Sequence, residues 1–201
     1  QRFDYIYNFV SSGDWEVMRS NGVSPLSDCK LKVARFNDDG TGDWHEQSPS
    51  NPVLIGRSLE EINVFTRLAA DAVGATPMDR PEWTTVAPNG DVYCTLTNNS
   101  RRAPEDTDAA NPLGPNPDGH IIRWHDCDDH VGTSFNWEIF LFAKDTRTTP
   151  WEFTDPDGLW CDPDGRVFIE TDGGQPNGNN QMLVADSQTK EIRRMFAGVD
   201  G

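Results

Sequence analysis

The chain has 201 residues, and its 33 acidic against 17 basic side chains give a formal net charge of −16. This length is enough for one sizeable core, and the negative charge disfavours nucleic acids and anionic membrane surfaces as partners. The 17 Gly and 14 Pro residues imply frequent turns, which favours many short strands over long helices. No apolar run is long enough for a membrane span.

The N-terminus has neither an initiator Met nor a signal-like segment, so we expect the chain to begin inside a larger protein or after processing. Its four cysteines, Cys29, Cys94, Cys127 and Cys161, show no CxxC spacing. Small hydrophobic side chains are the default interpretation of such cysteines, and they do not identify the redox compartment.

Two strands are expected near the N-terminus, because apolar and polar residues alternate over Phe3–Val10 and over Lys30–Phe36. An acidic, Gly-rich segment, Asn37–Asp43, follows the second strand and leads to Trp44. It lacks the late Glu of an EF-hand loop, so a hairpin turn is a better interpretation than a calcium loop.

One short helix is expected after these strands. Ser58 and Glu61 form a capping box, and the helix that they open should stop near Gly74. Its apolar stripe should contain Ile62, Phe65, Ala69 and Ala72.

The segment that follows the helix contains Arg80, Pro81 and Glu82. Residues before a proline favour extended geometry, and residues i and i+2 of an extended segment point to the same side. Arg80 and Glu82 should therefore face a common space, as an anion clamp beside a ligand for a hard cation. The alternative is an ordinary surface pair of Arg and Glu.

An internal repeat organises the rest of the chain. Pro88–Tyr93 aligns with Pro163–Phe168 at an offset of 75 residues (163 − 88). The same offset pairs Pro81 with Pro156, Glu82 with Asp157, Thr97 with Asp172, and Asn98–Asn99 with Gly173–Gly174.

Each copy of the repeat reads as two hairpins, and four antiparallel strands make one propeller blade. We therefore predict an all-β fold, a partial β-propeller with blades at residues 75–145 and 151–197 and a part-blade at 1–57. Propellers close with about four to eight blades, so two blades and part of a third would be a piece of a larger ring. The long polar segment 100–118 is expected to be a lid or a disordered insert.

Carboxylates at equivalent places on successive blades would converge near the central axis, where hard cations could take several oxygen ligands. Glu82 and Asp157 are the first candidates, although Pro156–Gly158 also suits a turn. Further oxygens could come from Asp172, Asn98, Asn99 and Asn180, and Asn98 and Asn99 are also candidates for binding the substrate. The cluster of His120, His125 and His130 does not match zinc-site spacing, because the first two should face opposite sides of a strand.

The motifs together resemble the PhoX-type alkaline phosphatases. The segments that carry the resemblance are Val33–Gly40, Thr66–Asp71, Met78–Trp83, Cys94–Asn99, Gly119–Trp124, Pro156–Trp160 and Asn179–Leu183. They run in order through nearly the whole chain, which makes the resemblance specific.

The resemblance implies a six-bladed propeller that hydrolyses phosphomonoesters with Fe³⁺ and Ca²⁺, is exported by the twin-arginine route, and is periplasmic or extracellular. It further implies that Arg80 binds the substrate phosphate, that Glu82 binds metal, and that Asp172 is a calcium ligand. The parent is expected to be a monomer. The family's iron-binding Cys and a further bridging Glu would lie upstream, and a Gly-Cys-Glu segment would lie beyond Phe196, so none of the four cysteines is assigned to metal.

The charge of −16 fits this interpretation, because bound cations and Arg80 would invert the local potential that otherwise repels phosphate. Two alternatives remain: a calcium-dependent propeller lactonase or sugar-ester hydrolase, and a non-catalytic propeller that binds a partner. Metal analysis separates the three. The isolated chain is expected to be inactive and to expose apolar blade faces at Trp83, Val92, Tyr93, Ile139 and Leu141.

Overall fold

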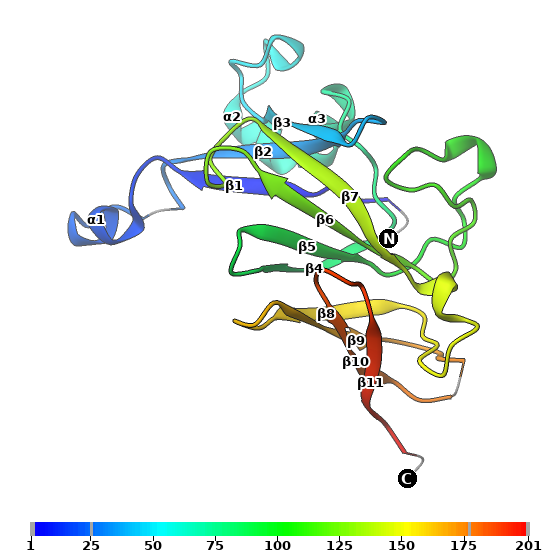
Figure 1. Ribbon diagram of the computed structural model, residues 1–201. Helices are drawn as coiled ribbons and strands as arrows, with labels where there is room; N and C mark the ends of the chain where they lie inside the picture. The colour runs from blue at the N-terminus through cyan, green and yellow to red at the C-terminus, as the bar shows by residue number, and fades with distance from the viewer. Residues whose placement is uncertain (1–2, 25, 177, 200–201) are drawn as a thin grey trace.

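The computed structural model describes residues 3–24, 26–176 and 178–199 and is mostly antiparallel β-sheet (Figure 1). The strands are β1 (Tyr7–Ser11), β2 (Cys29–Phe36), β3 (Thr41–Glu46), β4 (Pro81–Val86), β5 (Asp91–Leu96), β6 (His120–Asp126), β7 (Ser134–Phe142), β8 (Pro156–Cys161), β9 (Arg166–Thr171), β10 (Gln181–Asp186) and β11 (Ile192–Ala197). The α-helices are α1 (Trp15–Ser20), α2 (Leu59–Val64) and α3 (Thr66–Ala72), and short 3₁₀ turns cover Pro52–Leu54, Pro104–Asp106 and Ala143–Thr146.

Strands β4 to β7 and strands β8 to β11 form two consecutive antiparallel units, as the repeat predicts. Their registers agree at the offset of 75, since Pro81 pairs with Leu96 and Pro156 pairs with Thr171. Strands β1 to β3 extend the first unit, because β3 pairs with β7 and completes a seven-stranded sheet. This all-β arrangement is consistent with a propeller-like fold, and the number of blades remains a prediction.

The two units pack face to face around an apolar cluster. Tyr93 and Phe140 of the first unit meet Val167, Ile169 and Leu183 of the second, and all five side chains are buried. Burial of this much apolar surface is the main force that holds the units together. The expectation that Tyr93 is exposed is therefore wrong.

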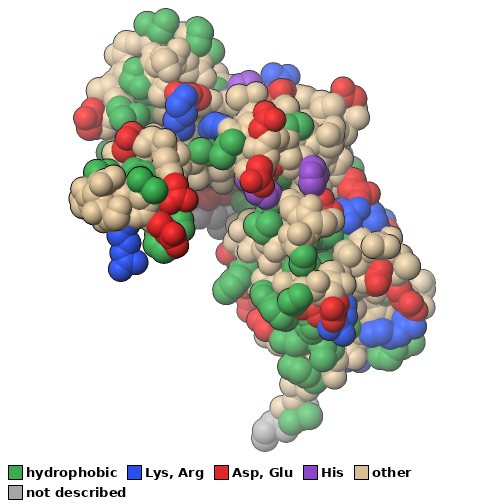
Figure 2. All heavy atoms as spheres, turned by 60° about the vertical axis from the view of Figure 1, so that its left-hand side comes forward, with side chains coloured by type: hydrophobic (Ala, Val, Ile, Leu, Met, Phe, Trp, Pro, Cys, Tyr) green, Lys and Arg blue, Asp and Glu red, His purple; other side chains and the backbone are tan. Residues whose placement is uncertain are grey.

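The other face of the first unit is covered by the β2–β3 hairpin. Phe36 and Trp44 pack there against Val92 and Trp124, so Val92 is also buried rather than exposed. Trp83, by contrast, is 57% exposed, as expected. Apolar side chains also gather over the lower part of the molecule in Figure 2, which leads to the C-terminus.

The helical prediction is right at the cap and at the end near Gly74, but wrong in expecting one continuous helix. Ser58 and Glu61 form the capping box, but the helix breaks at Phe65, whose φ and ψ are −105° and 40°. Thr66 Oγ1 donates to Asn63 O at 2.5 Å, a local bond that competes with helix continuation. The break turns Phe65 to solvent and leaves Ala69 buried. Helix α1 was not anticipated; Asp14 caps it by accepting from two backbone N–H groups.

The long segment 100–118 is ordered, so the alternative of a disordered insert is wrong, while a role as a lid stays a prediction. It folds back so that Asn116 pairs with Asn99, with N···O distances of 2.6 and 3.0 Å. Within the described residues, no helix is both long enough and apolar enough to cross a membrane.

Candidate functional site

The candidate side chains gather at one end of the two units. Arg80 lies just before β4 and Asn98 just after β5. In the second unit, Asp155 lies just before β8 and Asp172 just after β9. Because antiparallel hairpins bring the start of one strand beside the end of the next, these four positions share one edge.

The backbone at this edge differs from the sequence prediction. Arg80 is not extended: its φ is 55°, in the left-handed region, and Asp155 has a φ of 51°. Equivalent backbone hydrogen bonds accompany the two left-handed conformations. Arg80 O accepts from Thr97 N at 3.1 Å, and Asp155 O accepts from Asp172 N at 3.0 Å. Tertiary hydrogen bonds thus override the local preference of a residue before proline.

A β-bulge follows each of these residues. The pairing shifts between Pro81 and Thr84 in β4 and between Pro156 and Leu159 in β8. Glu82 and Asp157 lie within these irregular stretches. Bulges commonly re-aim side chains beside functional sites. The turn interpretation of Pro156–Gly158 is wrong, because these residues belong to a strand.

Arg80 and Glu82 do meet across the bulge. Arg80 Nε donates to Glu82 Oε1 at 2.9 Å, and their side chains are 33% and 36% exposed. Within the described residues no other hydrogen bond engages the Arg80 guanidinium, so its two terminal nitrogens can bind an anion. Glu82 also lines a hollow of about 240 Å³ together with Tyr5 and Tyr7.

Asp157 lies in strongly negative surroundings. Burial raises its pKa, the charges of Glu82 and Asp172 raise it further, and Arg80 opposes them. Glu170 adds to the same field, and sequence reasoning missed it. In the structure, a Cβ on Gly158 would lie 2.6 Å from Glu170 Oε2, so the glycine makes room for this carboxylate.

The carboxylates are the hard oxygen donors that Ca²⁺ takes. Their mutual repulsion at Asp157 is the kind that a bound cation relieves. Even so, no three Asp, Glu, His or Cys side chains among the described residues converge to hold an ion. Glu82, Asp157 and Asp172 therefore do not form a metal site by themselves, and their roles as ligands remain predictions.

The asparagines have different surroundings. Asn98 Nδ2 hydrogen-bonds Asp155 Oδ1, which links the two units at the candidate edge. Asn99 is buried, and its Nδ2 donates to Asp79 Oδ1 at 2.9 Å. Asn180 is exposed before β10 and accepts from Thr171 Oγ1 at 3.4 Å. The substrate or metal roles of all three remain predictions.

Asp155 was missed by sequence reasoning, although the repeat contained the signal. The offset of 75 places Asp155 at the position of Arg80 (155 − 80). The second unit therefore presents a carboxylate where the first presents a guanidinium.

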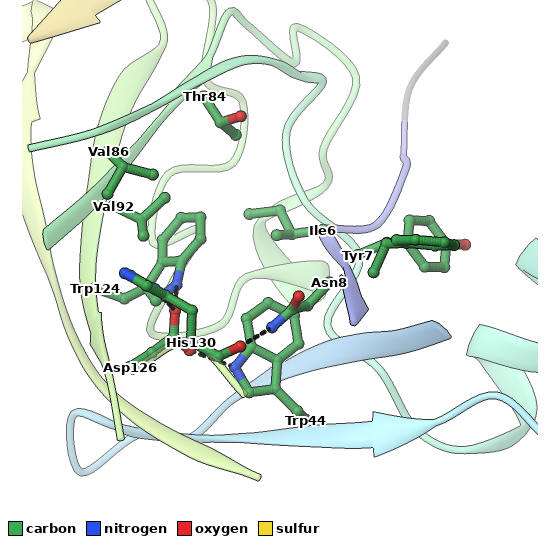
Figure 3. Close-up of a pocket in the computed structure, with 11 residues that line it drawn as sticks. Ile6, Tyr7, Asn8, Trp44, Thr84, Val86, Val92, Trp124, Asp126 and His130 are labelled. Atoms are coloured by element: carbon green, nitrogen blue, oxygen red, sulfur yellow. Dashed lines mark hydrogen bonds and ion pairs between the residues drawn. The ribbon is translucent and has the colours of Figure 1, made fainter. Parts of the chain in front are cut away.

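A separate pocket of about 220 Å³ lies between β1 and the first unit (Figure 3). Asp126 in its wall accepts from Trp44 Nε1 at 2.6 Å and Trp124 Nε1 at 3.0 Å, and lies 2.9 Å from His130 Nδ1. His120 is buried elsewhere, 2.8 Å from Ala110 O. The histidines are thus spread over separate structural contacts rather than a zinc site.

Comparison with known proteins is consistent with the all-β, propeller-like fold described above. The family described as Alkaline phosphatase PhoX matches residues 1–200. The solved structure of Pseudomonas fluorescens PhoX in complex with vanadate, a transition state analogue, is 37% identical, with a TM-score of 0.85. The match covers 98% of this chain and 40% of that one, so the chain spans well under half the length of the solved relative. No curated protein gives a significant sequence match. The chain belongs to the PhoX alkaline phosphatase family.

Proposed function

We propose that the protein hydrolyses phosphomonoesters and that this chain supplies part of the active site, with Arg80 as the phosphate clamp and Glu82 as a metal ligand. The observation that carries the proposal is the Arg80–Glu82 pair, held at 2.9 Å across a β-bulge at the edge where the two units meet. Family membership supports the reaction class. The vanadate bound to the solved relative supports a site for a phosphoryl group.

In this mechanism Arg80 donates to the non-bridging phosphoryl oxygens, where charge develops in the transition state. Glu82 orients the guanidinium by accepting from Nε, which leaves the terminal nitrogens directed at the substrate. Asp157 and Asp172 would join Glu82 in supplying oxygen ligands to Ca²⁺, and Fe³⁺ would need further ligands besides these. Such cations, when bound, polarise the phosphoryl oxygens and offset the repulsion between acidic protein and anionic substrate.

Location, assembly and the isolated chain follow as further proposals. We infer from the family resemblance that the protein is periplasmic or extracellular and works as a monomer. The 201-residue chain alone should be inactive, because carboxylates from this edge provide only part of a metal shell.

The test uses the full polypeptide that carries these residues. It should turn over an aryl phosphate at alkaline pH, be inhibited by vanadate, and contain iron and calcium. Calcium alone with carboxylic-ester hydrolysis would instead favour the lactonase alternative. The absence of both metal and activity would favour a binding module.

Two substitutions then test the residues. Arg80→Ala should lower kcat/KM by about 100- to 1,000-fold, as the loss of one transition-state donor typically does. Glu82→Gln should reduce the metal content. Arg166→Ala is the matched control, because Arg166 pairs with Asp162 and Asp164 at the turn between β8 and β9, the opposite end of the unit. Near-normal activity and metal in both site variants would refute the assignment.

A further inference from the structure

The segment just before Arg80 contains a fully buried ion pair. Asp79 and Arg102 meet with an Oδ1···Nε distance of 2.7 Å, and their side chains are 0% and 2% exposed. A buried pair gains little net stability over apolar residues of similar size, because both charges lose their hydration. Its presence beside a site residue therefore suggests a role in fixing one backbone geometry.

The described hydrogen-bond partners of Asp79 lie in the segment that follows β5. Asn99 Nδ2 donates to Oδ1 at 2.9 Å, and Asn116 Nδ2 donates to Oδ2 at 3.1 Å. The backbone N–H of Asp79 donates to Asn111 Oδ1 at 3.0 Å. A carboxylate with this many partners in a low-dielectric interior has one well-defined position.

Arg102 also holds the backbone on the other side of Asp79. Its Nη2 donates to Pro77 O at 2.8 Å, and its Nη1 donates to Asp106 O at 2.6 Å. The guanidinium thus joins the turn before β4 to the segment after β5 with a planar set of donors.

This network acts on a strained residue. Arg80 is the next residue after Asp79, and its φ of 55° is unfavourable for a side chain with a Cβ. On its far side, Arg80 O accepts from Thr97 N at 3.1 Å. The left-handed conformation is therefore held between the buried network and the end of β5.

We propose that Asp79 and Arg102 are positioning residues, which hold Arg80 in its left-handed conformation and so aim its guanidinium at the phosphoryl group of the substrate. This inference rests on the proposed phosphatase function. Neither residue touches the substrate, since both are buried. The segment 98–118 is then a fixed brace of the phosphate clamp.

A double-mutant cycle in the full polypeptide tests the coupling. Arg102→Met should lower kcat/KM for an aryl phosphate at least 10-fold in the otherwise unchanged enzyme and less than 2-fold in an Arg80→Ala background, because the network acts through Arg80. Arg102→Lys keeps the charge but not the fork of donors, and should recover only part of the loss. Equal losses in both backgrounds, or less than a 2-fold loss in the first, would overturn the proposal.

Two further arms separate positioning from a general loss of stability. Ile122→Ala, a buried core change in β6, should reduce thermal stability but leave kcat/KM of the folded enzyme within 2-fold. If Arg102→Met does not fold, Asn111→Ala keeps the Asp79–Arg102 ion pair but removes the bonds of Asn111 to the Asp79 N–H, Pro77 O and Asp108, and should give a smaller loss with the same dependence on Arg80. Additive behaviour of this milder variant would equally contradict positioning.

Hydrogen exchange tests the geometry without any enzyme activity. In Arg102→Met the amides of Arg80 and Thr97 should exchange at least 10-fold faster, while the amides of β9 and β10 stay unchanged. If the parent protein proves inactive, the proposed function fails and this arm alone decides whether the network holds Arg80. Unchanged exchange at both amides would refute the brace.

Discussion

Substitution of Gly119 tests how closely the two units approach each other at the candidate edge. It precedes β6 with a φ of +83°, and a Cβ built on it would lie 2.1 Å from Thr97 O, 2.6 Å from Leu96 O and 2.8 Å from Pro156 Cδ. Two of these contacts are backbone atoms at the end of β5, and the third is the first residue of β8. Gly119→Ala should therefore force apart the elements that place Arg80.

The cost has two parts. Left-handed geometry for a residue with a Cβ costs about 1–2 kcal/mol, and overpacking against structure that cannot easily move adds about 1–3 kcal/mol. We expect Gly119→Ala to lower the free energy of unfolding by about 2–5 kcal/mol in total. Gly74→Ala isolates the first part, because Gly74 has a φ of +73° and a Cβ added there would have no atom within 4 Å.

Urea unfolding of the full polypeptide measures both variants, with the free energy taken from linear extrapolation. The difference between Gly119→Ala and Gly74→Ala should be at least about 1 kcal/mol, which is the low end of the overpacking cost. Activity of folded Gly119→Ala should fall as well, because Thr97 bonds the Arg80 carbonyl. Equal destabilisation by the two substitutions would refute the close approach at this edge.

Two further predictions concern the cysteines and the exposed apolar face. Burial raises the pKa of Cys94 to about 12, so iodoacetamide should label exposed Cys29 at pH 8 and leave Cys94 unmodified until the protein unfolds. Labelling of both cysteines at the same rate in the native protein would contradict this. Trp160 is 56% exposed and lines a hollow of about 440 Å³ with Trp83 and Phe168. Trp160→Ser should therefore reduce self-association of the isolated chain, as measured by light scattering. An unchanged mass distribution would show that this face does not cause the self-association.

The repeat was predictable because each copy has the same local residue pattern. Pro, Gly and alternating apolar residues recur at a fixed offset, and they specify hairpins by rules that act within a few residues. The sequence repeat predicts that Pro81 and Pro156, and likewise Glu82 and Asp157, occupy equivalent positions in the two units. The observed registers and bulges agree with this. Burial was harder to predict: Tyr93 is in the core only because the second unit covers it.

The geometry of Arg80 was not predictable from its neighbours. The proline that follows it favours an extended conformation, yet hydrogen bonds from Thr97 and from the segment around Asn99 and Asn116 impose another. Thr97 lies 17 residues along the chain from Arg80 (97 − 80) and Asn116 lies 36 (116 − 80), and apolar periodicity gives no signal of hydrogen bonds between such positions. The helix break at Phe65 was missed for another reason, because the apolar periodicity continues across it; Thr66 Oγ1 bonds Asn63 O beside the break.

Hydrogen bonds between the two units fix the positions of the residues at the candidate edge, so these residues have to be considered together. Thr95 Oγ1 of β5 donates to Asp157 O of β8 at 2.7 Å, and Asn98 reaches Asp155 across the same junction. A change on either unit therefore alters the positions of carboxylates on the other. Because a cation takes several oxygen ligands within narrow distance limits, the packing between the repeats would also set the affinity for metal if these carboxylates bind it as proposed. Under the proposed function, the site would therefore need both copies of the hairpin repeat.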